Sequence, residues 1–309
     1  MNTWIGIDEA GYGPNLGPLV MVAVIAQSPD DREPDLWGDL NSTISRARGP
    51  IDRLWVDDSK QILKGGKGRD RLDQAAMATL QAAGIELPST YSRWLKSVGA
   101  GTLGDAELTP WLKANNDPAV LVKCPEGKPL ANERWRIVAV RAVVVGPAQF
   151  NSDIDATGSK ATAHFRAFSC LLRPIWEALD TSAHAICDKH GGRNFYLAPL
   201  SHAFPEIWID RGEEGPALSV YTLRDESKQL TLKFRPRADA ESGLVALASI
   251  TAKALRESWM DTFNEFWRSQ IPDLKPTAGY PVDAVRFRRQ MEATASRLNL
   301  PVNTWWRSR

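Results

Sequence analysis

The chain opens with a stretch that joins a strand, two acids and a glycine-rich loop: WIGIDEAGYGPNLGPLVMVAVI, residues 4–25. Its first apolar residues predict a buried strand over residues 3–8, which ends in the adjacent acids Asp8 and Glu9. The glycines and prolines that follow predict a turn, and the β-branched run at residues 19–25 predicts a second strand. The pattern therefore places two carboxylates where a core strand meets a loop.

Further along the chain, strands mix with long helices. We predict strands at residues 53–56, 135–145, 183–187, 206–209, 218–223 and 230–234, and helices at 69–83, 159–180, 240–267 and 282–298. This mixture indicates an α/β fold with a central mixed sheet flanked by helices. Because no linker-like stretch divides the chain, we expect a single catalytic domain over 1–309, with a core at about 1–262 and a C-terminal helical extension at about 263–309.

Four acids lie at the ends of elements predicted for the core: Asp8 and Glu9 after the first strand, Asp188 after a later strand, and Asp239 before the long helix. Each has an ordinary structural explanation, because a strand can run into a solvated turn and an acid commonly caps a helix. If the four converge at one edge of the sheet, their repulsion requires divalent cations. Oxygen-only ligands favour Mg²⁺ or Mn²⁺, and two such ions on a phosphodiester make a hydrolytic site.

Four blocks of sequence resemble, in order, the signatures of type 2 ribonucleases H, the ribonuclease HII and HIII families. The first is GIDEAGYG at residues 6–13 with GPLV at 17–20, and the second is the triplet DSK at 58–60. The third is Asp239 followed by SITAK at 249–253, and the fourth is Lys275 with GYP at 279–281, a helix and PVN at 301–303. Four ordered blocks across nearly the whole chain are a more specific signal than one acidic loop.

This resemblance implies a ribonuclease H-like fold and an endoribonuclease that uses Mg²⁺ or Mn²⁺. The implied substrate is RNA in RNA/DNA hybrids or duplex DNA that contains ribonucleotides, and the implied products carry 5′-phosphate and 3′-hydroxyl ends. The resemblance assigns catalysis and metal binding to Asp8, Glu9, Asp188 and Asp239. Asp210 is a rival for the third acid, because it also ends a predicted strand. Substrate binding is assigned to Gly11, Tyr12, Gly13, Ser59, Lys60 and Tyr280.

The first loop departs from the family pattern. Ribonuclease HII typically carries Gly-Arg-Gly there and ribonuclease HIII Gly-Thr-Gly, whereas this chain has a tyrosine at position 12. The flanking glycines still let main-chain N–H groups approach a ribose 2′-hydroxyl. Tyr12 either stacks on a sugar or base or packs against the loop. Residues 84–134 and 189–235 read as insertions that either bind substrate or extend the fold.

The composition is that of a globular protein, with 43% hydrophobic and 24% charged residues and a net charge of +1. Three cysteines without a CxxC pair argue against a disulfide framework or a structural zinc site. With no signal sequence and no long apolar run, we expect a cytoplasmic monomer that does not bind membranes. Basic clusters at residues 60–71, on the last helix and at Arg307 and Arg309 either follow a phosphate backbone or are simply solvated.

Two other classes of function compete with the endoribonuclease. A nucleic-acid-binding protein that keeps the fold but does not cleave would be expected to lose an acid, whereas all four acids are present. A sugar kinase or actin-like ATPase also opens with a strand, an aspartate and a glycine turn. It requires a second glycine-rich phosphate loop, for which Gly191 and Gly192 are only a weak candidate.

Overall fold

The computed structural model describes residues 1–46, 53–64, 66–99, 101–103, 109–112, 119–120, 127 and 129–308. Within them, eight strands form one mixed sheet in the order β5-β6-β2-β1-β7-β10-β9-β8. These strands are β1 (Asn2–Ala10), β2 (Leu19–Ser28), β5 (Gly101–Leu103), β6 (Arg136–Val145), β7 (Ala183–Asp188), β8 (Trp208–Glu214), β9 (Ser219–Arg224) and β10 (Gln229–Arg235). A separate parallel pair joins β3 (Ile44–Ser45) to β4 (Leu54–Trp55).

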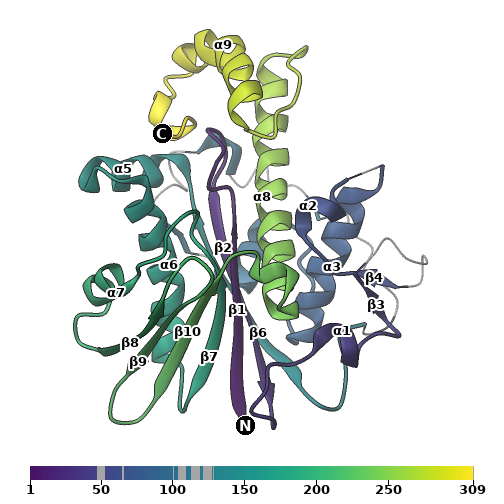
Figure 1. Cartoon of the computed structure of the whole chain (residues 1–309). Helices are drawn as coiled ribbons and strands as arrows, with labels where there is room; N and C mark the ends of the chain where they lie inside the picture. Colours follow the sequence, from purple (N-terminus) through teal and green to yellow (C-terminus); the bar gives the residue numbers. More distant parts are fainter. Residues whose placement is uncertain are drawn as a thin grey trace.

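Helices cover both faces of this sheet (Figure 1). They are α1 (Leu36–Asp39), α2 (Ser59–Ile62), α3 (Gly68–Ala82), α4 (Tyr91–Ser97), α5 (Pro147–Thr157), α6 (Lys160–Glu177), α7 (Leu197–Ala203), α8 (Gly243–Gln270) and α9 (Pro281–Arg297). Short 3₁₀ turns lie at η1 (Pro110–Leu112), η3 (Ala238–Ala240) and η4 (Val302–Thr304). The predicted α/β class, a mixed sheet flanked by helices, is confirmed.

The strand register brings three strand ends to one edge of the sheet. β1 runs parallel to β7, with Ile7 opposite Cys187. β7 in turn runs parallel to β10, with Asp188 opposite Arg235. Because parallel strands end at the same edge, the residues that follow β1, β7 and β10 lie next to one another.

Two buried apolar clusters stabilise the sheet from opposite faces, because side chains alternate along each strand. In β2, Val20, Val22 and Val24 join a cluster with α3, α8 and α9, while Met21 and Ala23 join a cluster with α6, α7 and β10. α8 crosses β1 at very short range: a Cβ added to Gly6 would lie 2.2 Å from the carbonyl carbon of Leu244. Glycine at position 6 is therefore required for this crossing.

The structure describes the two segments that we interpreted as insertions to different extents. Residues 189–235 form α7, β8, β9 and β10, so this segment extends the sheet on one side of β7. Residues 84–134 lie partly outside the described residues, and their described part holds α4, β5 and η1. α8 crosses residue 262 without a break, and the division there into core and extension stays a prediction. No helix in the described part of the chain is long and apolar enough to span a bilayer.

Candidate functional site

The four acids singled out in the sequence lie at the common edge of β1, β7 and β10. Asp8 is buried, with 8% of its surface exposed, and its Oδ1 accepts a hydrogen bond from the N–H of Glu9 at 2.7 Å. Asp188 ends β7, and its Oδ1 accepts a hydrogen bond from the N–H of Ala238 at 2.9 Å. Asp239 is the next residue, in the turn that follows β10. Asp188 thus fixes the backbone that carries Asp239.

The pKa values of these acids show that the carboxylates interact. Burial raises the pKa of Asp8 well above its usual value, and the charges of Glu9 and Asp188 raise it further. Burial raises the pKa of Asp239 to about 6, and Asp188 and then Asp58 add to the shift. Burial also raises the pKa of Asp188, where Glu9 acts in the same direction. The site therefore concentrates negative charge in a desolvated position.

The rival acid, Asp210, lies elsewhere. It belongs to β8, at the far edge of the sheet from β1, with β9 and β10 between β8 and β7. Its carboxylate forms an ion pair with Arg224, with Nε and Oδ2 at 2.7 Å. The structure brings Asp188, and not Asp210, to Asp8.

The DSK triplet reaches the same edge through α2. The side chain of Asp58 caps this helix by accepting from the N–H of Lys60 at 2.8 Å. Ser59 is buried, and its hydroxyl lies 3.2 Å from that of Ser249 on α8, which in turn hydrogen-bonds to Asp8. Lys60 is exposed, and its charge lowers the pKa values of Glu9 and Asp239. Lys60 therefore faces the acids from the solvent side.

The glycine loop follows β1 directly. A Cβ on Gly11, whose φ is +94°, would lie 2.3 Å from the carbonyl oxygen of Pro18, so no other residue fits there. The half-buried ring of Tyr12 contacts that of His164, with centroids 4.4 Å apart, and the ammonium of Lys160 lies 5.1 Å from its centroid. Gly13 is exposed. Tyr12 thus packs within the protein at one side of the acids.

Tyr280 lies next to the second half of the same loop, at Asn15 and Leu16. It caps α9 and is 48% exposed, and the preceding carbonyl, that of Gly279, accepts hydrogen bonds from the N–H groups of Asn15 and Leu16. Arg256 of α8 donates to the carbonyl oxygens of Leu16 at 3.1 Å and Ala278 at 3.0 Å. The first loop and the turn before α9 therefore form one structural unit, although they lie far apart in the sequence.

Two buried histidines, His164 and His190, border the acids. The sequence marks His190, just after Asp188, either as a residue that assists protonation of the leaving group or as an ordinary loop histidine, and it does not mark His164. Nε2 of His164 lies 3.5 Å from Oε1 of Glu9, and its ring lies edge-on to that of His190. Burial, with Arg307 and Arg193 nearby, lowers the pKa of His164 to about 3, so this ring is neutral near pH 7. His190 is enclosed by aromatic rings, including Phe168. The signals in the sequence are weak: His164 lies on the apolar face of a predicted helix, and His190 lies two residues after Asp188.

The four acids suit a divalent ion in their chemistry but not in the arrangement of their side chains. Their chemistry fits, because all four donors are carboxylates, and the charge of a neighbouring acid raises the pKa of three of them, Asp8, Asp188 and Asp239. Their side-chain positions are less convergent: no group of three or more Asp, Glu, His or Cys in the described residues is arranged to hold a metal ion. Binding of an ion would require these side chains to turn toward it.

Several predicted basic contacts are already engaged within the protein. Arg69 bonds Asp73 and Asp261, both at 2.7 Å, so it is not a free cation of the first cluster. Arg307 has only 1% of its surface exposed, and the expectation that it either follows a phosphate backbone or is solvated is wrong. Arg309 lies outside the described residues.

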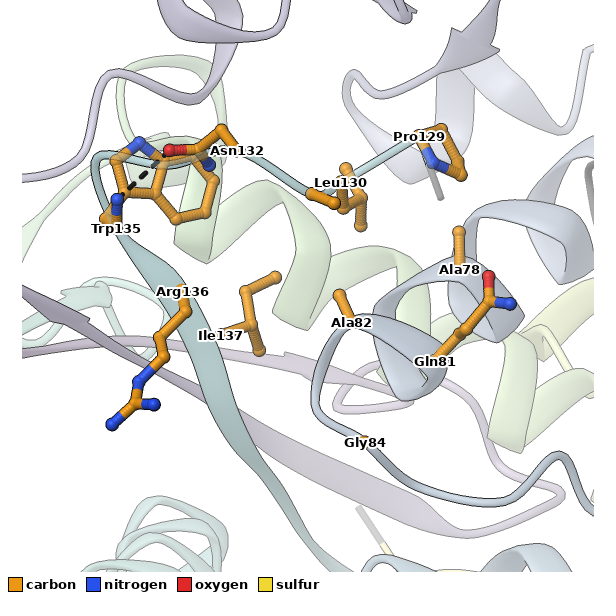
Figure 2. A pocket seen from close by; sticks show the side chains of 11 residues that line it. Ala78, Gln81, Ala82, Gly84, Pro129, Leu130, Asn132, Trp135, Arg136 and Ile137 are labelled. Carbon is orange, nitrogen blue, oxygen red and sulfur yellow. Dashed lines mark hydrogen bonds between the residues drawn. The ribbon is translucent and has the colours of Figure 1, made fainter. Parts of the chain in front are cut away.

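A separate pocket of about 290 Å³ lies between the end of α3, residues 129–132 and the start of β6 (Figure 2). Figure 2 shows the side chain of Asn132 close to Trp135, and the main-chain N–H of Trp135 donates to Oδ1 of Asn132 at 3.0 Å. Among the described residues that line this pocket there is no carboxylate. It lies near the end of the strands opposite to Asp8, because Arg136 pairs with Gln27, which in turn pairs with Thr3 at the start of β1. It takes no part in the candidate site.

Comparison with known proteins gives likeness in structure but not in sequence. No protein-family model and no curated protein matches the chain. Among solved structures, the PCNA:RNase HII complex from Archaeoglobus fulgidus matches at 16% identity and TM-score 0.49, over 99% of this chain and 94% of that one. Ribonuclease H2 from Pyrococcus horikoshii OT3 matches at 16% identity and TM-score 0.48, over 98% of this chain and 92% of that one. Bst-RNase HIII in complex with Mn²⁺ matches at 19% identity and TM-score 0.46, over 99% of this chain and 66% of that one.

These are structures of type 2 ribonucleases H, the family that the sequence motifs resemble. At identities of 16% to 19% and TM-scores of 0.46 to 0.49, these likenesses carry no argument about the activity of this chain. The chemistry of this chain is therefore argued from its own residues.

Proposed function

We propose that this protein is a divalent-metal-dependent endoribonuclease that hydrolyses the RNA strand of RNA/DNA hybrids and leaves 5′-phosphate and 3′-hydroxyl ends. One observation carries the proposal: Asp8, Glu9, Asp188 and Asp239 come from three adjacent strand ends and lie close enough to perturb one another's pKa values. Buried like charges are costly unless cations compensate them. Their retention in a packed core favours a binding role over a structural one.

In this proposal the four carboxylates hold Mg²⁺ or Mn²⁺. The bound ions would supply an activated water and stabilise the leaving oxygen of the phosphodiester. Lys60, exposed beside Glu9 and Asp239, contacts a substrate phosphate. The main chain of Gly11, Tyr12 and Gly13 meets the ribose, Tyr280 packs on a sugar, and Ser59 supports Asp8 through Ser249.

The second candidate is a nucleic-acid-binding protein that does not cleave. The observation in its favour is that, among the described residues, no three acids are arranged to hold an ion. The two candidates differ in whether added metal binds the acids. That difference can be measured without any turnover.

The test uses two labelled duplexes, one with a continuous RNA strand on DNA and one with a single ribonucleotide in DNA, with Mg²⁺ and then Mn²⁺. The wild type is expected to cut the hybrid, while Asp8→Asn and Asp239→Asn lose at least about 1,000-fold in rate. Asp210→Asn is the matched control, because it removes the same charge at the far edge of the sheet, and it is expected to retain full activity.

Metal binding is followed separately by the melting temperature. Mg²⁺ or Mn²⁺ should raise the melting temperature of the wild type and of Asp210→Asn but not that of Asp8→Asn. Binding of the hybrid without cleavage, together with no thermal shift from either metal, would favour the non-cleaving candidate. Full activity in both site variants would refute the assignment of the acids.

A further inference from the structure

The third residue from the C-terminus, Arg307, is buried under the first loop. One nitrogen of its guanidinium donates to the carbonyl oxygen of Gly11, and the other terminal nitrogen donates to that of Tyr12 at 3.4 Å. The guanidinium also stacks on Phe150 of α5, with its carbon 3.9 Å from the ring centroid. A side chain expected at the surface thus occupies the floor of the loop.

The tail that carries Arg307 is held from two sides. The main-chain N–H of Arg307 donates to the carbonyl oxygen of Asn15 at 2.8 Å, and the side-chain amide of Asn15 donates to the carbonyl oxygen of Arg307 at 3.3 Å. On the other side, Asn151 of α5 donates to the carbonyl oxygen of Trp306 at 2.7 Å and accepts from the N–H of Ser308 at 2.7 Å. Figure 1 shows the C-terminus beside the turn between β1 and β2. The position of the guanidinium is therefore fixed by the fold.

This arrangement orients the peptide groups of the loop. In a trans peptide the carbonyl and the N–H point in opposite directions. Because the carbonyls of Gly11 and Tyr12 point to Arg307, the N–H groups of Tyr12 and Gly13 point away from it. Neither N–H donates to an acceptor in the part of the chain that the structure describes, and Gly13 is exposed. Two successive unpaired N–H groups form a concavity suited to an anionic or hydroxyl oxygen.

Arg307 also brings charge without a local counter-ion. It forms no ion pair with a carboxylate among the described residues, and the ionisable groups around it include Arg256, Tyr12 and His164. A fully buried cation that meets only carbonyl oxygens and a ring lacks the compensation usual for a structural charge. The phosphate backbone of a nucleic acid would supply it from the other side of the loop.

We propose that Arg307 is a positioning residue of the first loop: it holds two peptide groups so that their N–H groups face the sugar-phosphate backbone of the substrate, and it places a positive charge behind them. This inference rests on the proposed function. It explains how the loop keeps its binding geometry without the arginine or threonine that the family carries at position 12. In this chain the guanidinium lies beneath the loop, where it is supplied by the C-terminal tail.

The test compares Arg307→Met, which removes the charge and both hydrogen bonds, with Arg307→Lys, which keeps the charge. Arg268→Met is the matched control, because Arg268 is an exposed arginine near the end of α8. Three quantities are measured: amide hydrogen exchange of a peptide spanning residues 9–18, with a peptide spanning β7 as reference; the kcat and KM for the continuous hybrid; and hybrid affinity in EDTA.

Arg307→Met is expected to speed exchange in the loop but not in β7, and to raise KM about tenfold with kcat within about threefold. Arg307→Lys should lie between it and the wild type, and Arg268→Met should match the wild type. If Arg307→Met does not fold, Asn151→Ala, which releases the tail, is expected to give the same pattern with a smaller amplitude. Unchanged loop exchange, or an equal effect in Arg268→Met, would overturn the proposal.

Failure of the proposed function would look different. A wild type that cuts neither duplex, with either metal, would remove the catalytic reading and leave loop exchange and EDTA affinity as measures of the role of Arg307. A loop that loses protection while affinity stays constant would show a purely structural arginine, which overturns the positioning role.

Discussion

Asp239 shows at the scale of one residue how the site stores charge. Its folded-state pKa of about 6 lies above the usual value of 3.8, so protonation favours the folded state. In the metal-free protein, Asp239 does not lower the free energy of unfolding below about pH 4, and it lowers this free energy increasingly as the pH rises to about 6. The shift corresponds to about 3 kcal/mol at most, and screening by solvent at this half-buried position reduces it to about 1 to 2 kcal/mol.

Asp239→Asn is therefore expected to stabilise the metal-free protein by about 1 to 2 kcal/mol above pH 7 and by almost nothing at pH 4. Urea unfolding in EDTA at both pH values measures the difference, and Asp210→Asn serves as the control, since Asp210 is paired with Arg224. A variant less stable than the wild type at pH 8 would mean that Asp239 has a structural role.

Tyr12 is the residue at which this chain departs most clearly from the family that it resembles. Its ring is fixed by contacts with His164 and Lys160. Of the two interpretations of Tyr12, the structure favours packing within the protein. The phenol therefore leaves the loop without a side-chain cation that could contact a phosphate beside a single ribonucleotide.

Tyr12→Arg is expected to raise cleavage of DNA with one ribonucleotide, relative to the continuous hybrid, by about tenfold, because a guanidinium binds phosphate in bidentate geometry. The ratio of the two kcat/KM values measures this change in preference. Tyr12→Phe is the control, since it keeps the ring and adds no charge. An unchanged ratio in Tyr12→Arg would show that position 12 does not set the range of substrates.

At the scale of elements, the crossing of β1 and α8 places the first and fourth acids in one site. β1 carries Asp8 and Glu9, and α8 follows Asp239 directly, with Ser242 as its N-cap. The crossing depends on Gly6, since a Cβ at that position would overlap the backbone at Leu244 and Val245. Backbone atoms cannot move aside as a flexible side chain can.

Gly6→Ala is accordingly expected to destabilise the protein by about 2 to 4 kcal/mol, the range of severe overpacking in a core. Gly66→Ala is the matched control, because a Cβ there meets nothing within 4 Å, and it should change the free energy of unfolding by less than about 0.5 kcal/mol. Chemical denaturation of both variants provides the comparison. A Gly6→Ala protein as stable as the wild type would show that α8 does not press on β1.

Periodicity in the sequence predicted most elements to within a few residues, because each buries one regular apolar face. The helix predicted at residues 240–267 is α8, and the one at 282–298 is α9. α5 was not predicted, although Pro147 at its first turn and Gly158 in a left-handed conformation after its last residue are ordinary helix boundaries. Its weak amphipathic pattern gave no periodic signal, so only tertiary packing fixes it.

The order of strands in the sheet is a property of the whole molecule that local pattern does not contain. Asp8, Asp188 and Asp239 were each marked by an apolar strand or a helix start, but their adjacency depends on β1, β7 and β10 being neighbours. Arg307 is a stronger case. Two residues from the end of the chain, its sequence context is that of a solvated tail, and its burial depends on Asn15 and Asn151, far away in sequence.

The distribution of charge over the whole molecule gives the last prediction. With a net charge of +1, the protein has no overall attraction for a polyanion, so any binding must come from local cations near the acids. Lys60 is exposed beside Glu9 and Asp239. Lys228 precedes β10 at the opposite end of that strand, and its ammonium donates to the carbonyl oxygen of Leu179 at 3.0 Å.

Lys60→Met and Lys228→Met change the net charge equally, so they separate local contact from bulk charge. If Lys60 contacts one phosphate, Lys60→Met should lower the slope of log affinity against log salt by about 0.9, whereas Lys228→Met should leave it unchanged. The slope is measured by titrating a labelled hybrid with Asp8→Asn protein in EDTA at several salt concentrations, so cleavage does not interfere. Equal slopes in the two variants would place the nucleic acid away from Lys60, and with it away from the four acids.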